Sequence, residues 1–249
     1  MTKTALVTGA ARGIGLATTR TFLERGWQVA MIDIDGEVLA RAADGLENVL
    51  VIETDVSDPA QVARMAGEVQ AAYGTLSALV NNAGVADFGP IGETTFDRWQ
   101  TVMRTNLDGP FLMAQACVPF MAQPGGAIVN IASISGVRAS TLRVAYGTSK
   151  AAVIHLSKQQ AVEYGEIGIR VNTVAPGPVD TKLALAVHTP QIREAYHEAI
   201  PLNRYGVEQE IANAICFLCS SEASYITGQL LSADGGFQAT GVGLPALRE

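Results

Sequence analysis

Seven short apolar runs alternate with longer helical patterns along the whole chain, and this rhythm limits the fold more than any other feature. The runs are continuously apolar, which is typical of strands buried on both faces. They are Ala5–Thr8, Val29–Asp33, Val49–Ile52, Ala78–Asn81, Ala127–Ile131, Arg170–Val174 and Leu230–Ser232. The helical patterns between them are Ile14–Arg25, Pro59–Tyr73, Thr95–Met121, Ala145–Tyr164 and Glu208–Cys219.

This alternation predicts an α/β fold, a Rossmann-like doubly wound parallel sheet of about seven strands with helices on both faces. The 249 residues contain no Pro-, Gly- or Ser-rich linker, so we expect one domain over 1–249. The stretch 181–206 departs from the rhythm, with helical fragments broken by Pro190 and Pro201. We interpret it as a substrate lid, and an ordinary surface excursion is the alternative.

The composition excludes several classes of protein. A net charge of −7 provides no basic face for nucleic acid or anionic lipid, and 48% hydrophobic residues argue against disorder. We see no signal peptide or membrane span, so a cytoplasmic protein is expected. The three cysteines fit a reducing compartment. Cys216 and Cys219 have CxxC spacing, but without further ligands they are better interpreted as core thiols.

A glycine-rich loop follows the first predicted strand and opens the first predicted helix. Glycine lets the backbone approach a pyrophosphate closely, and free N–H groups at a helix N-terminus attract it. The order Gly-x-x-x-Gly-x-Gly differs from the usual Gly-x-Gly-x-x-Gly, but its place between a strand and a helix favours dinucleotide binding. The candidate cofactor-binding residues here are Gly9, Arg12, Gly13, Ile14 and Gly15.

Asp33 ends the second predicted strand, 18 residues beyond Gly15. This is close to the position of the acid that binds the adenosine ribose in dinucleotide-binding proteins. A carboxylate accepts hydrogen bonds from the ribose hydroxyls and repels a 2′-phosphate, and Asp35 adds to that repulsion. The cofactor is therefore expected to be NAD rather than NADP, although Arg12 is a candidate partner for a phosphate.

Two further strand ends carry candidate cofactor residues. The pair Asp55 and Val56 follows the third strand, and Asn82, Ala83 and Gly84 follow the fourth. The carboxyl ends of strands line the ligand crevice in an open α/β sheet. Taken alone, each segment is also compatible with an ordinary turn.

Tyr146 and Lys150 begin a long predicted helix and, at four residues apart, share one of its faces. A free tyrosine has a pKa near ~10, and a neighbouring cation is expected to lower it toward the range useful for acid–base catalysis. Taken alone, this spacing is equally that of a solvated surface pair.

Ser133 and Asn106 favour a catalytic interpretation of the Tyr146–Lys150 pair. Ser133 ends the fifth strand, 13 residues before Tyr146, and its hydroxyl is a candidate to bond a developing alkoxide, with Ser135 as the alternative. Asn106 lies inside a predicted helix, where asparagine is unfavourable, which suggests a role beyond helix formation.

Together with Pro176 and Gly177, these motifs resemble those of the short-chain dehydrogenase/reductases, in their compact single-domain branch. The resemblance runs from Thr4 to about Gly236. One departure is Ala132, where the family often has a serine, and it touches no assigned role. The resemblance implies a seven-stranded parallel sheet and a homotetramer.

The resemblance also implies roles for single residues. Tyr146 becomes the general acid or base, and Ser133 orients the substrate carbonyl. Lys150 binds the nicotinamide ribose and tunes the phenol, while Asn106 holds a water of the proton relay. The segment expected to hold the nicotinamide end comprises Pro176, Gly177, Val179 and Thr181.

The expected function is an NAD-dependent oxidoreductase that moves a hydride between nicotinamide and a small secondary alcohol or ketone, of the polyol, sugar or hydroxy acid class. An NADPH-linked 3-oxoacyl-thioester reductase and a non-catalytic dinucleotide-binding sensor are the alternatives. Substrate contacts are expected from Ser135–Arg143 and Leu183–Tyr205.

Within these two segments, a cation is a candidate to meet a carboxylate or phosphate of the substrate. The three candidates are Arg138, Arg143 and His188. No metal is expected for this chemistry, and His155 and His197 are interpreted as surface or packing residues.

Overall fold

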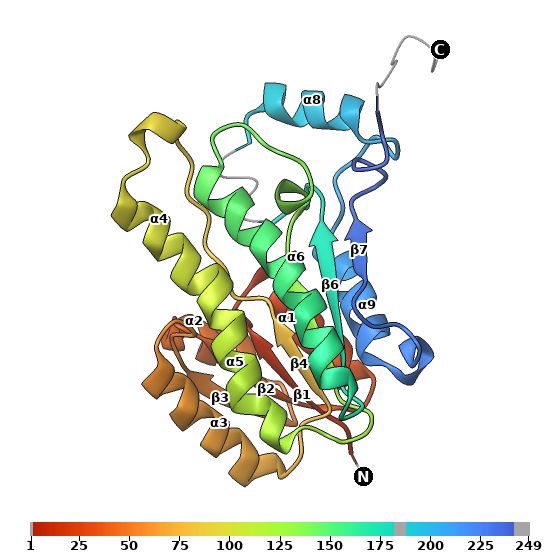
Figure 1. The fold of residues 1–249 in the computed structure, drawn as a ribbon. Coiled ribbons are helices and arrows are strands. Elements are labelled where there is room, and N and C mark those ends of the chain that lie inside the picture. The colour runs from red at the N-terminus through yellow and green to blue at the C-terminus, as the bar shows by residue number, and fades with distance from the viewer. Residues whose placement is uncertain (1, 182–187, 242–249) are drawn as a thin grey trace.

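The computed structural model describes residues 2–181 and 188–241. A seven-stranded parallel sheet runs in the order β3-β2-β1-β4-β5-β6-β7 (Figure 1). The strands are β1 Thr4–Thr8, β2 Gln28–Asp33, β3 Val49–Glu53, β4 Ala78–Asn81, β5 Ala127–Ile131, β6 Arg170–Pro176 and β7 Leu230–Ala233. Every predicted apolar run lies within one of them, so the predicted fold class is confirmed.

Helices connect successive strands and cover the sheet. The α-helices are α1 Gly13–Glu24, α2 Gly36–Ala43, α3 Pro59–Tyr73, α4 Phe96–Met103, α5 Gly109–Cys117, α6 Val144–Gly165, α8 Pro190–Ala199 and α9 Glu208–Cys219. Short helical turns lie at η1 Ile91–Glu93, η2 Arg104–Asp108, η3 Val118–Phe120, η4 Ile134–Gly136 and η5 Ser221–Ala223. Among the helices described, none has the length and apolar character needed to cross a membrane.

The sheet separates two hydrophobic cores, because successive side chains of a strand point to opposite faces. Val7 packs into the core beneath α1, α2 and α9, together with Phe22 and Ile215. The neighbouring Leu6 packs into the core beneath α3, α5 and α6, together with Met113. Figure 1 shows α6 and α9 on opposite sides of the sheet, and α8 beyond the ends of the strands.

The predicted single helix over Thr95–Met121 is wrong in its interior. The structure has α4 and α5 joined by the π-helical turn η2, which contains Asn106. Pro110 explains the interruption, because it has no N–H to donate to the carbonyl of Asn106 four residues earlier.

Two further differences concern short helices. The sequence analysis missed α2, whose N-terminus is capped by Asp35 accepting from the Val38 amide at 3.2 Å. Pro190 begins α8 instead of breaking a helix, because proline at the first turn loses no intrahelical bond. Residues 182–187 of the predicted lid lie outside the described residues.

The packing of Phe22 yields a test of the fold. Its ring is fully buried, 4.8 Å from the Trp27 ring between centroids. We expect Phe22→Ala to lower the free energy of unfolding by about 3–5 kcal/mol, measured by urea denaturation. Phe96→Ala is the matched control, since that side chain is 69% exposed and should change stability by less than about 0.5 kcal/mol. Equal losses in both variants would contradict the described core.

Candidate active site

A cavity of about 1440 Å³ lies along the carboxyl edge of the sheet. Because the strands are parallel, the loops that follow β1 to β6 all open into it. Most of the predicted site residues line it, including Asp33, Ser133 and Tyr146. Gly15 and Asn106 do not, and each supports the cavity wall from behind.

The glycine loop turns sharply between β1 and α1. Gly9 and Gly13 have φ angles of +65° and +59°, a left-handed conformation that favours glycine. A Cβ atom on Gly15 would lie 2.1 Å from the carbonyl oxygen of Gly9. Gly15 therefore permits α1 to pack against its own entry loop, whereas Gly9 and Gly13 line the cavity.

Hydrogen bonds clamp this loop to the end of β4. The Thr8 hydroxyl accepts from the amides of Asn82 and Ala83, both at 3.0 Å. The Asn82 side-chain amide donates to the carbonyl oxygens of Thr8 and Gly9 at 2.9 and 3.2 Å. The Asn82–Gly84 segment therefore joins two strand ends at the cavity.

The Asp33 carboxylate lies at one end of the cavity. It accepts from the amides of Ala11 at 3.0 Å and Asp35 at 3.1 Å, which orients it at the end of β2. Arg12 and Asp35 form an exposed ion pair of 2.6 Å beside it. Arg12, the candidate partner for a phosphate, is therefore already paired with the Asp35 carboxylate.

Asp55 and Val56 line the same end of the cavity, after β3. The Asp55 carboxylate accepts from both the amide and the hydroxyl of Ser57, at 2.8 and 2.7 Å. Val56 is buried and would contact a Cβ atom placed on Gly109 at 3.0 Å. Asp55 is therefore oriented locally, whereas Val56 also packs against the start of α5.

Tyr146, Ser133 and Lys150 meet at the other end, where β5 and α6 come together. The Lys150 ammonium is buried, donates to the Ile131 carbonyl at 2.8 Å and lies 5.9 Å from the Tyr146 ring centroid. Burial lowers the pKa of Lys150 to about 8. Ser133 lines the cavity at the same end and lowers the pKa of the Tyr146 phenol.

The pKa of Tyr146 differs from the expectation that Lys150 would lower it. Burial, the largest effect, raises the pKa of the phenol above its ordinary value, because it disfavours the charged form. Ser133 and the charge of Arg143 act in the opposite direction. In the described structure, therefore, the phenol stays protonated at neutral pH.

Ser133 is better placed than Ser135 to contact the oxygen of a substrate. Ser133 accepts the Ser135 amide at 3.1 Å, which leaves its own proton for donation. The Ser135 hydroxyl is paired with that of Ser140 at 3.2 Å. Both serines line the cavity, but of the two only Ser133 acts on the pKa of Tyr146.

Asn106 is fully buried behind the tyrosine and clamps the loop that follows β4. Its carbonyl oxygen accepts the Val85 amide at 2.8 Å, and its amide donates to the Val85 carbonyl at 2.9 Å. It also donates to the Ser149 hydroxyl, which in turn donates to the Tyr146 carbonyl at 2.7 Å. Asn106 therefore connects two walls of the site through its side chain.

The segment after β6 closes the cavity beneath α8. Pro176, Gly177, Val179 and Thr181 line it as predicted. A Cβ on Gly177 would lie 2.7 Å from the Cα of Asp234, so only glycine fits against the end of β7.

Substrate-side residues were only partly predicted. Arg143 and His188 line the cavity, whereas Arg138 donates instead to the Phe237 carbonyl at 2.8 Å. Tyr196, within the segment Leu183–Tyr205 expected to contact substrate, also lines the cavity, whereas Phe88 lines it and was missed, because no local pattern distinguishes a pocket aromatic from a core aromatic.

The remaining histidines and cysteines lie elsewhere. Within the described ranges, no cluster of His, Cys, Asp or Glu is arranged to hold a metal ion. His155 is exposed on α6, and the His197 ring packs 5.4 Å from that of Tyr205. Cys216 and Cys219 are buried in α9, and burial raises the pKa of both thiols, which fits core packing.

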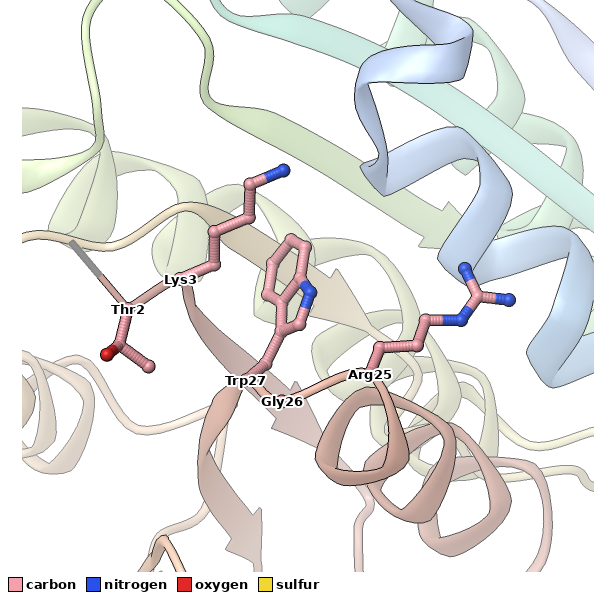
Figure 2. Close-up of a pocket in the computed structure, with 5 residues that line it drawn as sticks. All are labelled: Thr2, Lys3, Arg25, Gly26 and Trp27. Carbon is pink, nitrogen blue, oxygen red and sulfur yellow. The ribbon is translucent and has the colours of Figure 1, made fainter.

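A second hollow of about 530 Å³ lies at the opposite edge of the sheet, beside the starts of β1 and β2. Figure 2 shows Lys3 and Arg25 on either side of Trp27, and the Lys3 ammonium lies 5.2 Å from the indole centroid. None of the predicted site residues lines it. The carboxyl-edge cavity is therefore the candidate active site.

Known proteins share this sequence and fold. A family model described as enoyl-(acyl carrier protein) reductase matches residues 9–238. The 3-oxoacyl-(acyl-carrier-protein) reductase FabG of Chlamydia trachomatis is 37% identical over 240 residues, covering 94% of this chain and 96% of that protein. The cis-4-hydroxycyclohexanecarboxylate dehydrogenase of Sinomonas cyclohexanicum is 38% identical over 242 residues, covering 95% and 97%.

A solved structure agrees with these matches. The crystal structure of levodione reductase superimposes with a TM-score of 0.91 at 31% identity, covering 96% of this chain and 98% of its own. The chain belongs to the short-chain dehydrogenase/reductase family and is an oxidoreductase that acts on CH–OH groups.

Proposed function

We propose that the protein is an NAD-dependent oxidoreductase that interconverts a secondary alcohol and its ketone. The observation that carries this proposal is the layout of one cavity, with Asp33 at one end and the Ser133–Tyr146–Lys150 group at the other. A nicotinamide cofactor bound between them would supply or accept the hydride. The alternative of a non-catalytic sensor has no support, because the family is one of oxidoreductases.

The residues present fit a dinucleotide. The first turn of α1 contains no acidic residue, and its N-cap residue Arg12 makes no side-chain capping bond. The N-terminus of this helix is therefore open to a pyrophosphate. Lys150 and Asn106 lie 3.3 and 3.2 Å from the position of a Cβ on Gly84, so a side chain at this turn would press against both residues.

Tyr146 would hold and move the proton. In ketone reduction, a hydride reaches the carbonyl carbon while the protonated phenol donates its proton to the carbonyl oxygen. Burial favours this donor state by raising the pKa of the phenol. In alcohol oxidation the proton travels the other way, and Ser133 and the cationic side chains stabilise the phenolate.

Ser133 and Lys150 would assist this transfer from two sides. The Ser133 hydroxyl donates to the substrate oxygen, where negative charge develops. Lys150 binds the nicotinamide ribose and keeps a positive charge near the phenol. Asn106 holds the loop at Val85, and its backbone in the π-helical turn is the proposed anchor of the relay water.

The choice of NAD over NADP rests on charge. A 2′-phosphate would approach the carboxylates of Asp33 and Asp35, and Arg12 is already paired with Asp35 at 2.6 Å. The relative named as a 3-oxoacyl-(acyl-carrier-protein) reductase favours the second candidate, an NADPH-linked thioester reductase. The relative named for a hydroxycyclohexanecarboxylate favours a dehydrogenase of hydroxy acids.

Further proposals concern the lid, the assembly and the compartment. The described part of 181–206 contains α8, from which Tyr196 reaches the cavity, which supports a substrate lid.

Phe111 on α5 and Val162 on α6 are 45% and 74% exposed, which supports burial of these helices in a homotetramer. We place the protein in the cytoplasm on its free thiols.

Replacement of Tyr146 tests the reaction directly. Tyr146→Phe should bind NAD normally and lose about 10²–10⁴-fold in kcat, because general acid–base catalysis disappears. The measurement is nicotinamide absorbance with a panel of secondary alcohols and ketones. Tyr164→Phe, on the same helix outside the cavity, is the control and should retain activity. Near-normal turnover by Tyr146→Phe would refute the assigned role.

Cofactor preference tests the role of the two carboxylates. The wild type should have a much higher kcat/KM with NAD than with NADP. Asp33→Asn should lower the kcat/KM for NAD about 10- to 100-fold, because hydrogen bonds to a charged acceptor are lost. Asp35→Asn should instead improve NADP use by freeing Arg12. Comparable efficiency with both cofactors in the wild type would favour the NADPH-linked alternative.

The buried amine of Lys150 gives a pH test. Its pKa falls from 10.5 to about 8 on folding, so between these values the unfolded chain binds more protons. The free energy of unfolding should therefore rise with pH. The difference between wild type and Lys150→Met should increase by about 2 kcal/mol from pH about 8 to pH about 10.

Comparison with Lys150→Met removes the titration of the cysteines and of Tyr146, which both proteins share. Lys158→Met, an exposed position on the same helix, is the control and should show a difference that is constant over this pH range. Urea denaturation at each pH provides the measurement. A constant or falling difference for Lys150→Met would show that burial does not lower the pKa of the Lys150 amine.

A further inference from the structure

The charges around the cavity are unevenly distributed. Its acidic lining residues gather at the adenosine end, where Asp33, Asp35 and Asp55 lie together with Arg12 and Arg41. Glu208 is beside the glycine loop, with its carboxylate 3.6 Å from the position of a Cβ on Gly13. At the Tyr146 end the charged or titratable lining residues are Arg104, Arg143, Lys150 and His188. This end therefore favours an anion, although the whole chain has a net charge of −7.

Arg143 is the half-buried cation of this group that has no carboxylate partner. Its guanidinium lies 4.9 Å from the centroid of the Phe88 ring. Among the described residues, none of the ion pairs and side-chain hydrogen bonds involves it, whereas Arg98 and Arg193 are each paired with an aspartate at 2.7 Å. Its hydrogen-bond donors are therefore available to a ligand in the cavity.

The backbone around Arg143 is held in an unfavourable conformation. Leu142 has a φ angle of +62°, in the left-handed region that non-glycine residues rarely adopt. Its carbonyl accepts the Gly89 amide at 3.0 Å, and Gly89 and Arg143 form an isolated bridge. Strain of this kind concentrates at ligand-binding sites, where surrounding contacts maintain it.

The aromatic support of Arg143 is also fixed. Arg98 of α4 donates to the Asp87 carboxylate at 2.7 Å and to the Phe88 carbonyl at 3.0 Å. A Cβ on Gly89 would lie 3.1 Å from the Arg98 guanidinium, so the loop and the arginine are closely packed. These contacts hold the backbone at Phe88, and the ring of Phe88 lies against the Arg143 guanidinium.

The charge of Arg143 reaches the reacting groups. It lowers the pKa of both Tyr146 and His188. Burial is the largest cause of the lowered pKa of His188, which keeps that imidazole neutral at neutral pH. Lys150 is engaged with the Ile131 carbonyl. The half-buried Arg143 guanidinium therefore lines the same cavity as Tyr146 and, among the described residues, has no ion-pair partner.

We propose that Arg143 binds a carboxylate of the substrate, so that the preferred substrates are hydroxy acids and oxo acids rather than neutral alcohols. The proposal rests on the proposed oxidoreductase function and narrows its substrate class. The planar fork of a guanidinium matches both oxygens of a carboxylate, and a single such charge suits a monoanion better than a phosphate. Polyols and sugars, which have no charge, would leave Arg143 without a partner.

The test compares charged and neutral forms of the same substrate. A series of short and cyclic hydroxy acids, each with its methyl ester, is assayed with NAD and the purified full chain. The wild type should prefer the acid over its ester about 10- to 100-fold in kcat/KM, the worth of a charge-assisted hydrogen bond. Arg143→Met should reduce that ratio to near one, and Arg143→Lys should give an intermediate ratio.

The ratio is the informative quantity, because loss of Arg143 also changes the pKa of Tyr146 and so alters turnover of both substrate forms. Arg138→Met is the matched control. That guanidinium also lies over an aromatic ring, 5.2 Å from the Phe237 centroid, but outside the cavity. It should leave the ratio as in the wild type. An unchanged ratio in Arg143→Met, or a wild type that prefers esters, overturns the proposal.

A binding measurement separates this proposal from the proposed function. Isothermal titration of the NAD-loaded protein uses cyclohexanecarboxylate as the probe and cyclohexanecarboxamide as its neutral counterpart. The carboxylate should bind at least about 10-fold more tightly to the wild type and lose this advantage in Arg143→Met. Arg143-dependent binding without turnover of any substrate would refute the proposed reaction alone. Turnover with equal binding of both probes would refute the role of Arg143 alone.

Discussion

The parallel pairing of β1, β4, β5 and β6 is the constraint on which the rest of the site depends. Parallel strands end at the same edge, so the segments that follow them must meet there. The Thr8 hydroxyl and the Asn82 amide then tie the first two of these ends together through four hydrogen bonds. Residues far apart in the chain form one cavity wall because the strands that precede them end at the same edge of the sheet.

The second constraint is the cost of burying polar groups. Lys150 and Asn106 are almost fully buried, and each is stable only because it has partners of the right kind. The Ile131 carbonyl receives the ammonium, and both backbone groups of Val85 bond to the asparagine. These bonds hold the walls of the site rigidly before any ligand binds, which is what a precise transfer of a proton requires.

The distribution of charge makes the two ends of this cavity different. Carboxylates at the β2 end suit ribose hydroxyls, whereas free cationic groups at the α6 end suit an anionic substrate. The same two ends explain the proposed preference for NAD and the proposed preference for hydroxy acids. A ligand that lies along the cavity would therefore meet opposite fields at its two ends, which fixes its orientation as well as its affinity.

Local patterns along the chain were enough to predict the fold class and all seven strands, and most of the predicted site residues line the cavity. Buried parallel strands must be apolar, and sharp turns at their ends need residues such as Gly9, so both leave a periodic trace. The apolar pattern did not predict two details of the helices. Pro110 interrupts a helix whose apolar spacing is continuous, and the short helix α2, capped by Asp35, was not expected.

What the sequence by itself determined is therefore the architecture and the candidates for the reacting groups, because both depend on residue type and order. Only the tertiary structure decided their chemical state. Burial raises the pKa of Tyr146 although a cation stands four residues away, since desolvation is a property of the surroundings in three dimensions. The choice among Arg138, Arg143 and His188 is of the same kind. These cations look equivalent along the chain, and only the fold places Arg143 half-buried over Phe88, unpaired with any carboxylate of the described residues, in the lining of the candidate active site.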